Sequence, residues 1–142
     1  MEKRKVLSIA VLELLSNILA DTTDDLTETE IHRFLLQAGI SDISENETFL
    51  AKRKRLFNAF ANFQNTQNCC NNILKFIQLV LTPSRFVGKS DEFVSLRSKV
   101  NQQLAFEGYE IRENGKFAQI QKANVISDVE LKVENLDRKS VV

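Results

Sequence analysis

The chain has little of the side-chain chemistry on which metal sites and catalysis depend. Its 142 residues include one histidine, two cysteines, one proline, four glycines and no tryptophan. The cysteines, Cys69 and Cys70, are adjacent, so they cannot staple distant segments, and with His32 they fall short of the four spaced ligands of structural zinc. A single imidazole leaves little for nucleophilic catalysis, and the glycines form no phosphate-binding loop. We expect no enzyme, no metal and no cofactor.

A long uninterrupted apolar run is also missing. Glu13, Ser16 and Asn17 divide the apolar stretch from Val6 to Ala20 before it reaches the length of a membrane span. We therefore expect a cytoplasmic protein with no membrane partner. The composition, 43% apolar and 27% charged, is typical of one globular domain at this length.

Apolar residues recur at helical spacing through most of the chain and predict a mainly α-helical fold. Thr27 and Glu30 form a capping box at the start of a helix that Gly39 ends. On the helix that follows, Phe49 and Phe60 share the apolar face. The five predicted helices lie at about residues 5–20, 27–38, 49–63, 73–81 and 90–107.

The segment Tyr109–Ile120 carries the clearest local signal, that of a β-hairpin. Asn114-Gly115 suits a two-residue type I′ turn, which needs a positive φ at both positions. In that register alternate residues, Phe117 among them, point away from the helices. The face that packs on the helices would consist of Tyr109, Ile111, Ala118 and Ile120.

These elements predict one mainly α domain, a five-helix bundle over residues 1–122 that carries the hairpin at 109–120 as a wing. A winged-helix-like arrangement is one form that such a domain takes. After residue 122 the helical pattern weakens and its flanks are charged. We interpret residues 123–142 as a linker or truncated helix leading toward a C-terminal module that this sequence does not contain.

Charge is segregated along the chain, although 19 basic and 19 acidic residues cancel. Residues 21–48 contain eight acids and one base, whereas residues 49–90 contain seven bases and no acid. The basic block opens with Lys52-Arg-Lys-Arg55. Arg53 projects toward the apolar side of the predicted helix, so either its side chain extends along the edge of that face or the helix starts near Arg53. A basic helix that continues into asparagines is typical of surfaces that bind phosphates and base edges. The alternative is that the two blocks neutralise each other within the fold.

The charge pattern gives a set of candidate contacts to nucleic acid, with DNA and RNA both open. Lysine and arginine side chains would bind phosphates, and asparagines on the same helix would reach a base edge or a sugar. Basic residues on the hairpin would act as a wing, although a polar outer face is also ordinary for a hairpin. The candidates are Lys52, Lys54, Arg55, Asn58, Asn62, Arg85, Lys89, Arg112 and Lys116.

Several stretches resemble a known family over roughly residues 5–125. In order they are Leu26–Ile31, Lys54–Ala59 with Gln64-Asn65, Pro83–Val87 and Asn101–Gly108. They are similar to the N-terminal region of Ymh-type proteins, which are associated with prophages and abortive infection. In that family a C-terminal HEPN domain follows, an all-helical module that often cleaves RNA through an Arg-x4-6-His motif. The sole histidine of this chain, His32, has no arginine at that spacing.

The resemblance implies a non-catalytic recognition domain of a bacterial phage-defence protein, which with the basic helix would bind nucleic acid. The alternative is a protein-interaction or dimerisation module that regulates an attached HEPN ribonuclease effector. Its contact surface would be an apolar patch of Phe117, Val129 and Val133. A third reading, a compact enzyme, needs a concave site that combines His32 with acids of perturbed pKa.

Overall fold

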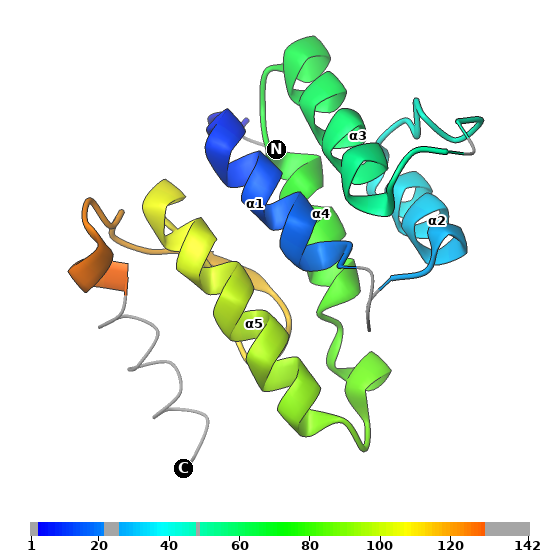
Figure 1. Ribbon diagram of the computed structural model, residues 1–142. Coiled ribbons are helices and arrows are strands. Elements are labelled where there is room, and N and C mark those ends of the chain that lie inside the picture. Colours follow the sequence, from blue (N-terminus) through cyan, green and yellow to red (C-terminus); the bar gives the residue numbers. More distant parts are fainter. Residues whose placement is uncertain (1–2, 22–25, 48, 130–142) are drawn as a thin grey trace. The chain divides into compact units, whose positions relative to one another are not determined.

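The computed structural model describes residues 3–21, 26–47 and 49–129, which form a mainly helical protein with a two-stranded hairpin (Figure 1). This confirms the predicted fold class. The chain divides into two compact units, Met1–Val80 and Leu81–Val142, within the region that the sequence predicts as one domain. No helix in the described ranges combines the length and the apolar character that crossing a membrane requires.

In the described part of the first unit, four helices surround an apolar core. They are α1 (Ile9–Leu19), α2 (Glu28–Ala38), α3 (Lys52–Gln67) and α4 (Asn71–Val80). Helix α1 packs against α3, and α2 packs against α4. The ring of Phe76 on α4 meets those of Phe60 and Phe34 edge to face, with centroids 5.2 and 6.3 Å away. Burying each such ring stabilises the fold by about 1.5–3 kcal/mol, so this unit has a core of its own.

Helix α1 begins later than its apolar pattern predicts. Residues 3–8 belong to no helix or strand, and the Ser8 hydroxyl caps a helix that starts at Ile9. The predicted start near Lys5 is wrong. Leu7 is instead held by backbone hydrogen bonds to the side chain of Gln64, and its own side chain is buried.

Helix α2 follows its sequence pattern closely. The Thr27 hydroxyl accepts the Glu30 N–H, and the Glu30 carboxylate accepts the Thr27 N–H, both at 3.1 Å. Gly39 ends the helix with a φ of 75°, a left-handed conformation that favours glycine. The predicted capping box and stop are confirmed, because both depend only on residues within one turn of the helix ends.

Helix α3 starts near Arg53, which is one of the two alternatives that the sequence leaves open, and it ends later than predicted. It begins only at Lys52, so Phe49 precedes it with a fully exposed side chain, and the prediction that Phe49 belongs to the apolar face is wrong. Arg53 then lies in the first helical turn and is exposed. At the other end the helix continues to Gln67 and stops at Asn68, which takes a left-handed φ of 55°.

In the described part of the second unit, one long helix supports the hairpin. The elements in order are η1 (Pro83–Phe86) and η2 (Ala105–Glu107), both 3₁₀ helices, with α5 (Ser90–Leu104) between them, then β1 (Tyr109–Ile111) and β2 (Phe117–Gln119). Helix α5 packs on β1. The buried amide of Asn101 joins them, because it bonds both backbone groups of Ile111, at 2.7 and 3.0 Å.

The hairpin is present, but its register differs from the prediction by one residue. Tyr109 pairs with Gln119, and Ile111 with Phe117. The turn has three residues rather than two, because Gly115 takes a positive φ of 84° and Asn114 does not. A three-residue loop with glycine in the left-handed position is the next most common hairpin connection after the two-residue turns.

The register shift moves Phe117 from the outer face to the packed face. Its ring is half-buried and meets the ring of Tyr109 edge to face, with centroids 6.3 Å apart. The prediction that Phe117 is the exposed aromatic of the hairpin is therefore wrong.

Two of residues 123–129, which are predicted to begin a linker, are buried in the second unit. Val129 is buried and packs with Ala105 and Ala123. The predicted contact patch of Phe117, Val129 and Val133 is wrong for Val129, and Phe117 is half-buried rather than exposed. Val133 lies outside the described residues.

Candidate functional site

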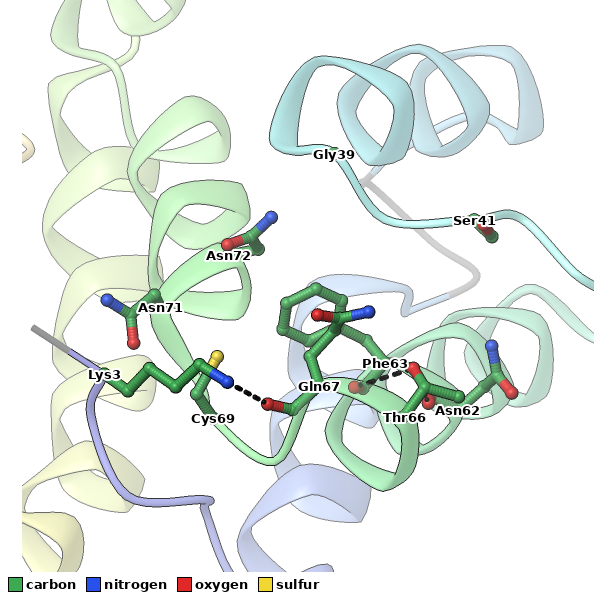
Figure 2. Close-up of a pocket in the computed structure, with 10 residues that line it drawn as sticks. All are labelled: Lys3, Gly39, Ser41, Asn62, Phe63, Thr66, Gln67, Cys69, Asn71 and Asn72. Carbon is green, nitrogen blue, oxygen red and sulfur yellow. Dashed lines mark hydrogen bonds between the residues drawn. The ribbon is translucent and has the colours of Figure 1, made fainter. Parts of the chain in front are cut away.

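A pocket of about 510 Å³ opens on the first unit, and Asn62, one of the predicted site residues, lines it (Figure 2). Its walls come from the loop after α2, the C-terminal half of α3 and the first turn of α4, with Lys3 at one side. Lys3 Nζ donates to the Gln67 carbonyl oxygen at 3.3 Å. Among the described lining residues, four carry amides, two carry hydroxyls, and none carries a carboxylate.

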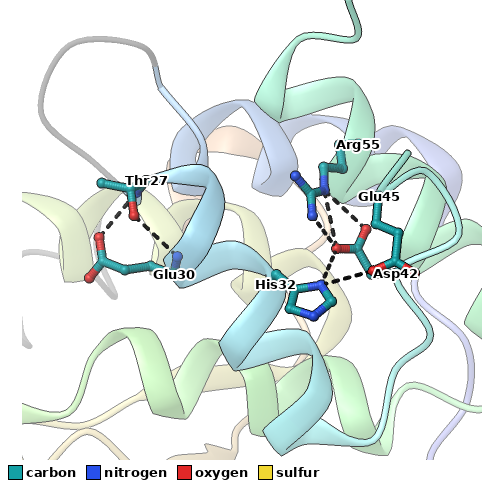
Figure 3. Close-up of polar contacts among 6 residues, drawn as sticks. All are labelled: Thr27, Glu30, His32, Asp42, Glu45 and Arg55. Carbon is teal, nitrogen blue, oxygen red and sulfur yellow. Dashed lines mark hydrogen bonds and ion pairs between the residues drawn. The ribbon is translucent and has the colours of Figure 1, made fainter. Parts of the chain in front are cut away.

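Arg55, another predicted site residue, is engaged in an ion pair with Asp42 (Figure 3). Its Nε donates to the two carboxylate oxygens at 3.0 and 3.2 Å, and its Nη2 donates to Oδ2. His32 Nδ1 lies 2.9 Å from Asp42 Oδ2 and 3.4 Å from Glu45 Oε2. The Asp42 side chain is only 2% exposed and that of Arg55 11%, so little of the pair reaches solvent. The guanidinium group of Arg55 therefore binds the loop after α2.

The environment of Asp42 keeps its carboxyl group ionised. Burial alone raises the pKa of Asp42, but hydrogen bonds and charge from Arg55, and then from His32, outweigh it and hold the pKa below the ordinary 3.8. The same hydrogen bond to Asp42 raises the pKa of Arg55. Both partners are thus charged across the physiological range.

His32, Asp42 and Glu45 also offer donor atoms within 4.8 Å of one another, a spacing at which side chains can share a metal ion. The Arg55 guanidinium, however, already occupies both oxygens of Asp42. A cation bound there would be repelled by Arg55 at short range. These contacts are better explained as structural bonds that hold the loop after α2 against α2 and α3 than as a metal centre.

Two further predicted residues, Lys52 and Asn58, also bond the unit's own chain. Lys52 Nζ donates to the Leu26 carbonyl oxygen at 3.1 Å and to that of Asp21 at 3.5 Å. Asn58 donates to the Ser44 hydroxyl at 3.1 Å. With Arg55, three of the five candidates on α3 thus contact the segments before and after α2. Among these three, the ion pair of Arg55 with Asp42 is an instance of the internal neutralisation that the sequence leaves open.

Arg53 and Lys54, the two basic residues between Lys52 and Arg55, are exposed on the first turn of α3. Lys54 Nζ lies 5.4 Å from the centroid of the Phe57 ring. Within the described ranges, neither residue forms an ion pair. Arg53 is not among the predicted site residues, because the apolar pattern projects it toward the apolar side of the predicted helix. The sequence signal that could have identified Arg53 is the run of four consecutive basic residues at 52–55. Such a run is unfavourable at a helix N-terminus and is more typical of an exposed surface.

The remaining four candidates belong to the second unit. Arg85 stacks over Phe86, with 5.4 Å from Cζ to the ring centroid, and Lys89 is exposed just before α5. Arg112 and Lys116 are exposed beside the hairpin turn, and Arg112 Nε lies 3.4 Å from Glu110 Oε1. The nine candidates therefore do not form one cluster within either unit.

The hairpin turn reaches the start of the second unit. A Cβ added to Gly115 would lie 2.6 Å from the carbonyl oxygen of Leu81 and 3.0 Å from Pro83 Cδ. The backbone beside Lys116 therefore lies near the segment that leads into η1, which carries Arg85. These two bases share one end of the second unit.

The chain matches no protein-family model, no curated protein and no solved structure.

Proposed function

We propose that this chain is a non-catalytic recognition module that binds nucleic acid through the first turn of α3. The observation that carries the proposal is the exposure of Arg53 and Lys54, without ion pairs among the described residues, in a block of chain that contains no acid. Guanidinium and ammonium groups displayed in this way bind phosphates, and each contact releases counterions and adds salt dependence.

The N-cap and first turn of α3 have residues that are unfavourable at a helix N-terminus. Its N-cap residue is Ala51, which offers no side-chain hydrogen bond, and its first turn contains four bases and no acid. Cations at a helix N-terminus oppose the macrodipole and destabilise the helix. Lys52 and Arg55 are compensated by their internal contacts, whereas Arg53 and Lys54 are not. A role in binding accounts for two uncompensated cations at this position.

Two aromatic residues close to Arg53 and Lys54 in the sequence support the same proposal. Phe49 is fully exposed three residues before α3, and Phe57 is half-buried under Lys54. An exposed ring near cations in the chain suits nucleic acid, because nucleobases stack on aromatic rings while cations hold the backbone.

The experiment compares binding of fluorescent single-stranded and duplex oligonucleotides by wild type and by the double variant Arg53→Gln, Lys54→Gln at about 50 mM salt, where phosphate contacts are strong. We expect the double variant to bind more weakly while its thermal stability is equal or slightly higher, because the dipole is relieved. Lys75→Gln, an exposed base on α4, is the matched control. Equal binding by wild type and the double variant would overturn the proposal.

We further propose, from the resemblance of the sequence to Ymh-type proteins, that the module serves a cytoplasmic phage-defence protein and governs an effector domain. Expression with and without an attached HEPN module in phage-challenged bacteria tests this setting. Protection that is unchanged by Arg53→Gln, Lys54→Gln would separate defence from nucleic-acid binding.

A further inference from the structure

The amide-lined pocket of the first unit is separate from the basic turn of α3. It lies at the other end of the same helix, where Asn62 and Phe63 line it together with Asn72 at the start of α4 and with Lys3 (Figure 2). From Lys54 to Asn62 the helix advances eight residues, or about 12 Å at 1.5 Å per residue. One ligand could therefore touch both places only if it were longer than a single nucleotide.

The chemistry of the pocket selects a ligand class. Lys3 provides the one formal charge among the described lining residues, and no carboxylate opposes it there, so the pocket favours an anion. Side-chain amides carry a donor and an acceptor together, the pattern that pairs with the edge of a nucleobase. The Phe63 ring adds an apolar wall. A volume of about 510 Å³ falls within the usual range for pockets that hold small ligands.

The groups that would contact such a ligand are available. The described part of the chain contains no hydrogen-bond partner for the side-chain amides of Asn62 and Asn72, and both are half-buried at the pocket wall. The bond from Lys3 Nζ to the Gln67 carbonyl is long at 3.3 Å, so the ammonium can turn to a phosphate at little cost.

We infer that this pocket binds one nucleotide, with its phosphate at Lys3 and its base against the amides of Asn62 and Asn72. The nucleotide is either a free mononucleotide or one unstacked nucleotide of a bound strand. In the second case the inference rests on the proposed function, because a strand held at Arg53 and Lys54 would place the nucleotide in the pocket.

The test is calorimetric titration of the chain with nucleoside 5′-monophosphates, with inorganic phosphate and with short single-stranded oligonucleotides. Asn62→Asp keeps the shape of the side chain but puts a carboxylate in the pocket, and we expect it to weaken nucleotide binding by at least about tenfold through like-charge repulsion. Asn65→Asp places the same charge on the exposed face of α3, outside the pocket lining, and should leave mononucleotide binding within about twofold.

The outcomes separate this inference from the proposed function. Mononucleotide binding lost in Asn62→Asp supports a free nucleotide, and oligonucleotide binding alone lost in Asn62→Asp supports a strand. Binding of mononucleotide that is no tighter than that of inorganic phosphate would exclude a free nucleotide. Equal binding of both mononucleotide and oligonucleotide by wild type and Asn62→Asp would overturn the inference. Arg53→Gln, Lys54→Gln should weaken only oligonucleotide binding, so mononucleotide binding can survive a failure of the proposed function.

Discussion

The side-chain amide of Gln64 pairs with both backbone groups of Leu7. Its Oε1 accepts the Leu7 N–H at 2.8 Å, and its Nε2 donates to the Leu7 carbonyl oxygen at 2.9 Å. Both residues are buried, so the amide replaces the hydrogen bonds that water or a neighbouring strand would supply. These two bonds hold the segment before α1 against α3, although the two residues are 57 positions apart in the sequence.

Gln64→Leu should therefore destabilise the fold. Each buried backbone group left without a partner costs about 1–3 kcal/mol, so we expect a loss of about 2–6 kcal/mol in the free energy of unfolding. Urea denaturation measures it. The control is Gln37→Leu, at an exposed position of α2, which should change the free energy by less than about 0.5 kcal/mol. Equal midpoints for wild type and Gln64→Leu would contradict this structural role.

The ion pair of Arg55 with Asp42 should behave as a buried pair rather than as a surface contact. Arg55→Met leaves the Asp42 carboxylate buried without its main partner, which typically costs about 3–5 kcal/mol. The double variant Arg55→Met, Asp42→Leu should be more stable than Arg55→Met alone, since apolar replacement of both partners is often neutral. A thermodynamic cycle by urea denaturation gives both values. A loss below about 1 kcal/mol in Arg55→Met, the size expected of an exposed pair, would contradict the burial of this pair.

The same pair predicts how stability depends on pH. The pKa of Asp42 in the fold lies below 3.8, whereas in the unfolded chain it is about 3.9. Its contribution to stability is therefore fully present above about pH 5 and is lost as the pH falls through the folded-state pKa. The stability difference between wild type and Asp42→Asn should accordingly shrink below about pH 4. Urea denaturation at several pH values measures it, and a difference that grows in acid would contradict the lowered pKa.

Two glycines with nearly the same backbone conformation should respond differently to substitution. Gly115 and Gly88 have φ values of 84° and 80°, but a Cβ at Gly115 would meet the Leu81 carbonyl oxygen at 2.6 Å, whereas one at Gly88 would meet nothing within 4 Å. Alanine costs about 1–2 kcal/mol at either position for the left-handed conformation. At Gly115 we expect a further loss of about 1–3 kcal/mol from the clash. Equal thermal midpoints for Gly88→Ala and Gly115→Ala would contradict the close approach.

The parts of the fold that the sequence predicts correctly are those set by local chemistry. The capping box of Thr27 with Glu30 and the stop at Gly39 need only neighbouring residues. The hairpin register does not follow in the same way, because Asn114-Gly115 suits both a two-residue and a three-residue loop. The observed choice brings Gly115 against Leu81, a contact that no local pattern contains.

The candidate site also depends on contacts between residues that are distant in the sequence. Arg53, Lys54 and Arg55 are consecutive bases, and the helical projection of the sequence places Arg53, rather than Arg55, toward the interior. The loop after α2 brings Asp42 to Arg55, which makes that base structural and leaves its two neighbours exposed. The charge blocks therefore leave both an exposed surface and internal neutralisation open, and the choice of residues follows from which turn of α3 the acidic loop reaches.

The salt dependence of nucleic-acid binding tests the central claim most directly. For wild type and for Arg53→Gln, Lys54→Gln, the dissociation constant of one oligonucleotide is measured between about 50 and 200 mM salt. Two lost phosphate contacts should reduce the slope of log K against log salt by about 1.4–1.8, while Lys75→Gln should leave the slope unchanged. Undetectable binding by wild type at the lowest salt, or the same slope in wild type and the double variant, would contradict an interface at the first turn of α3.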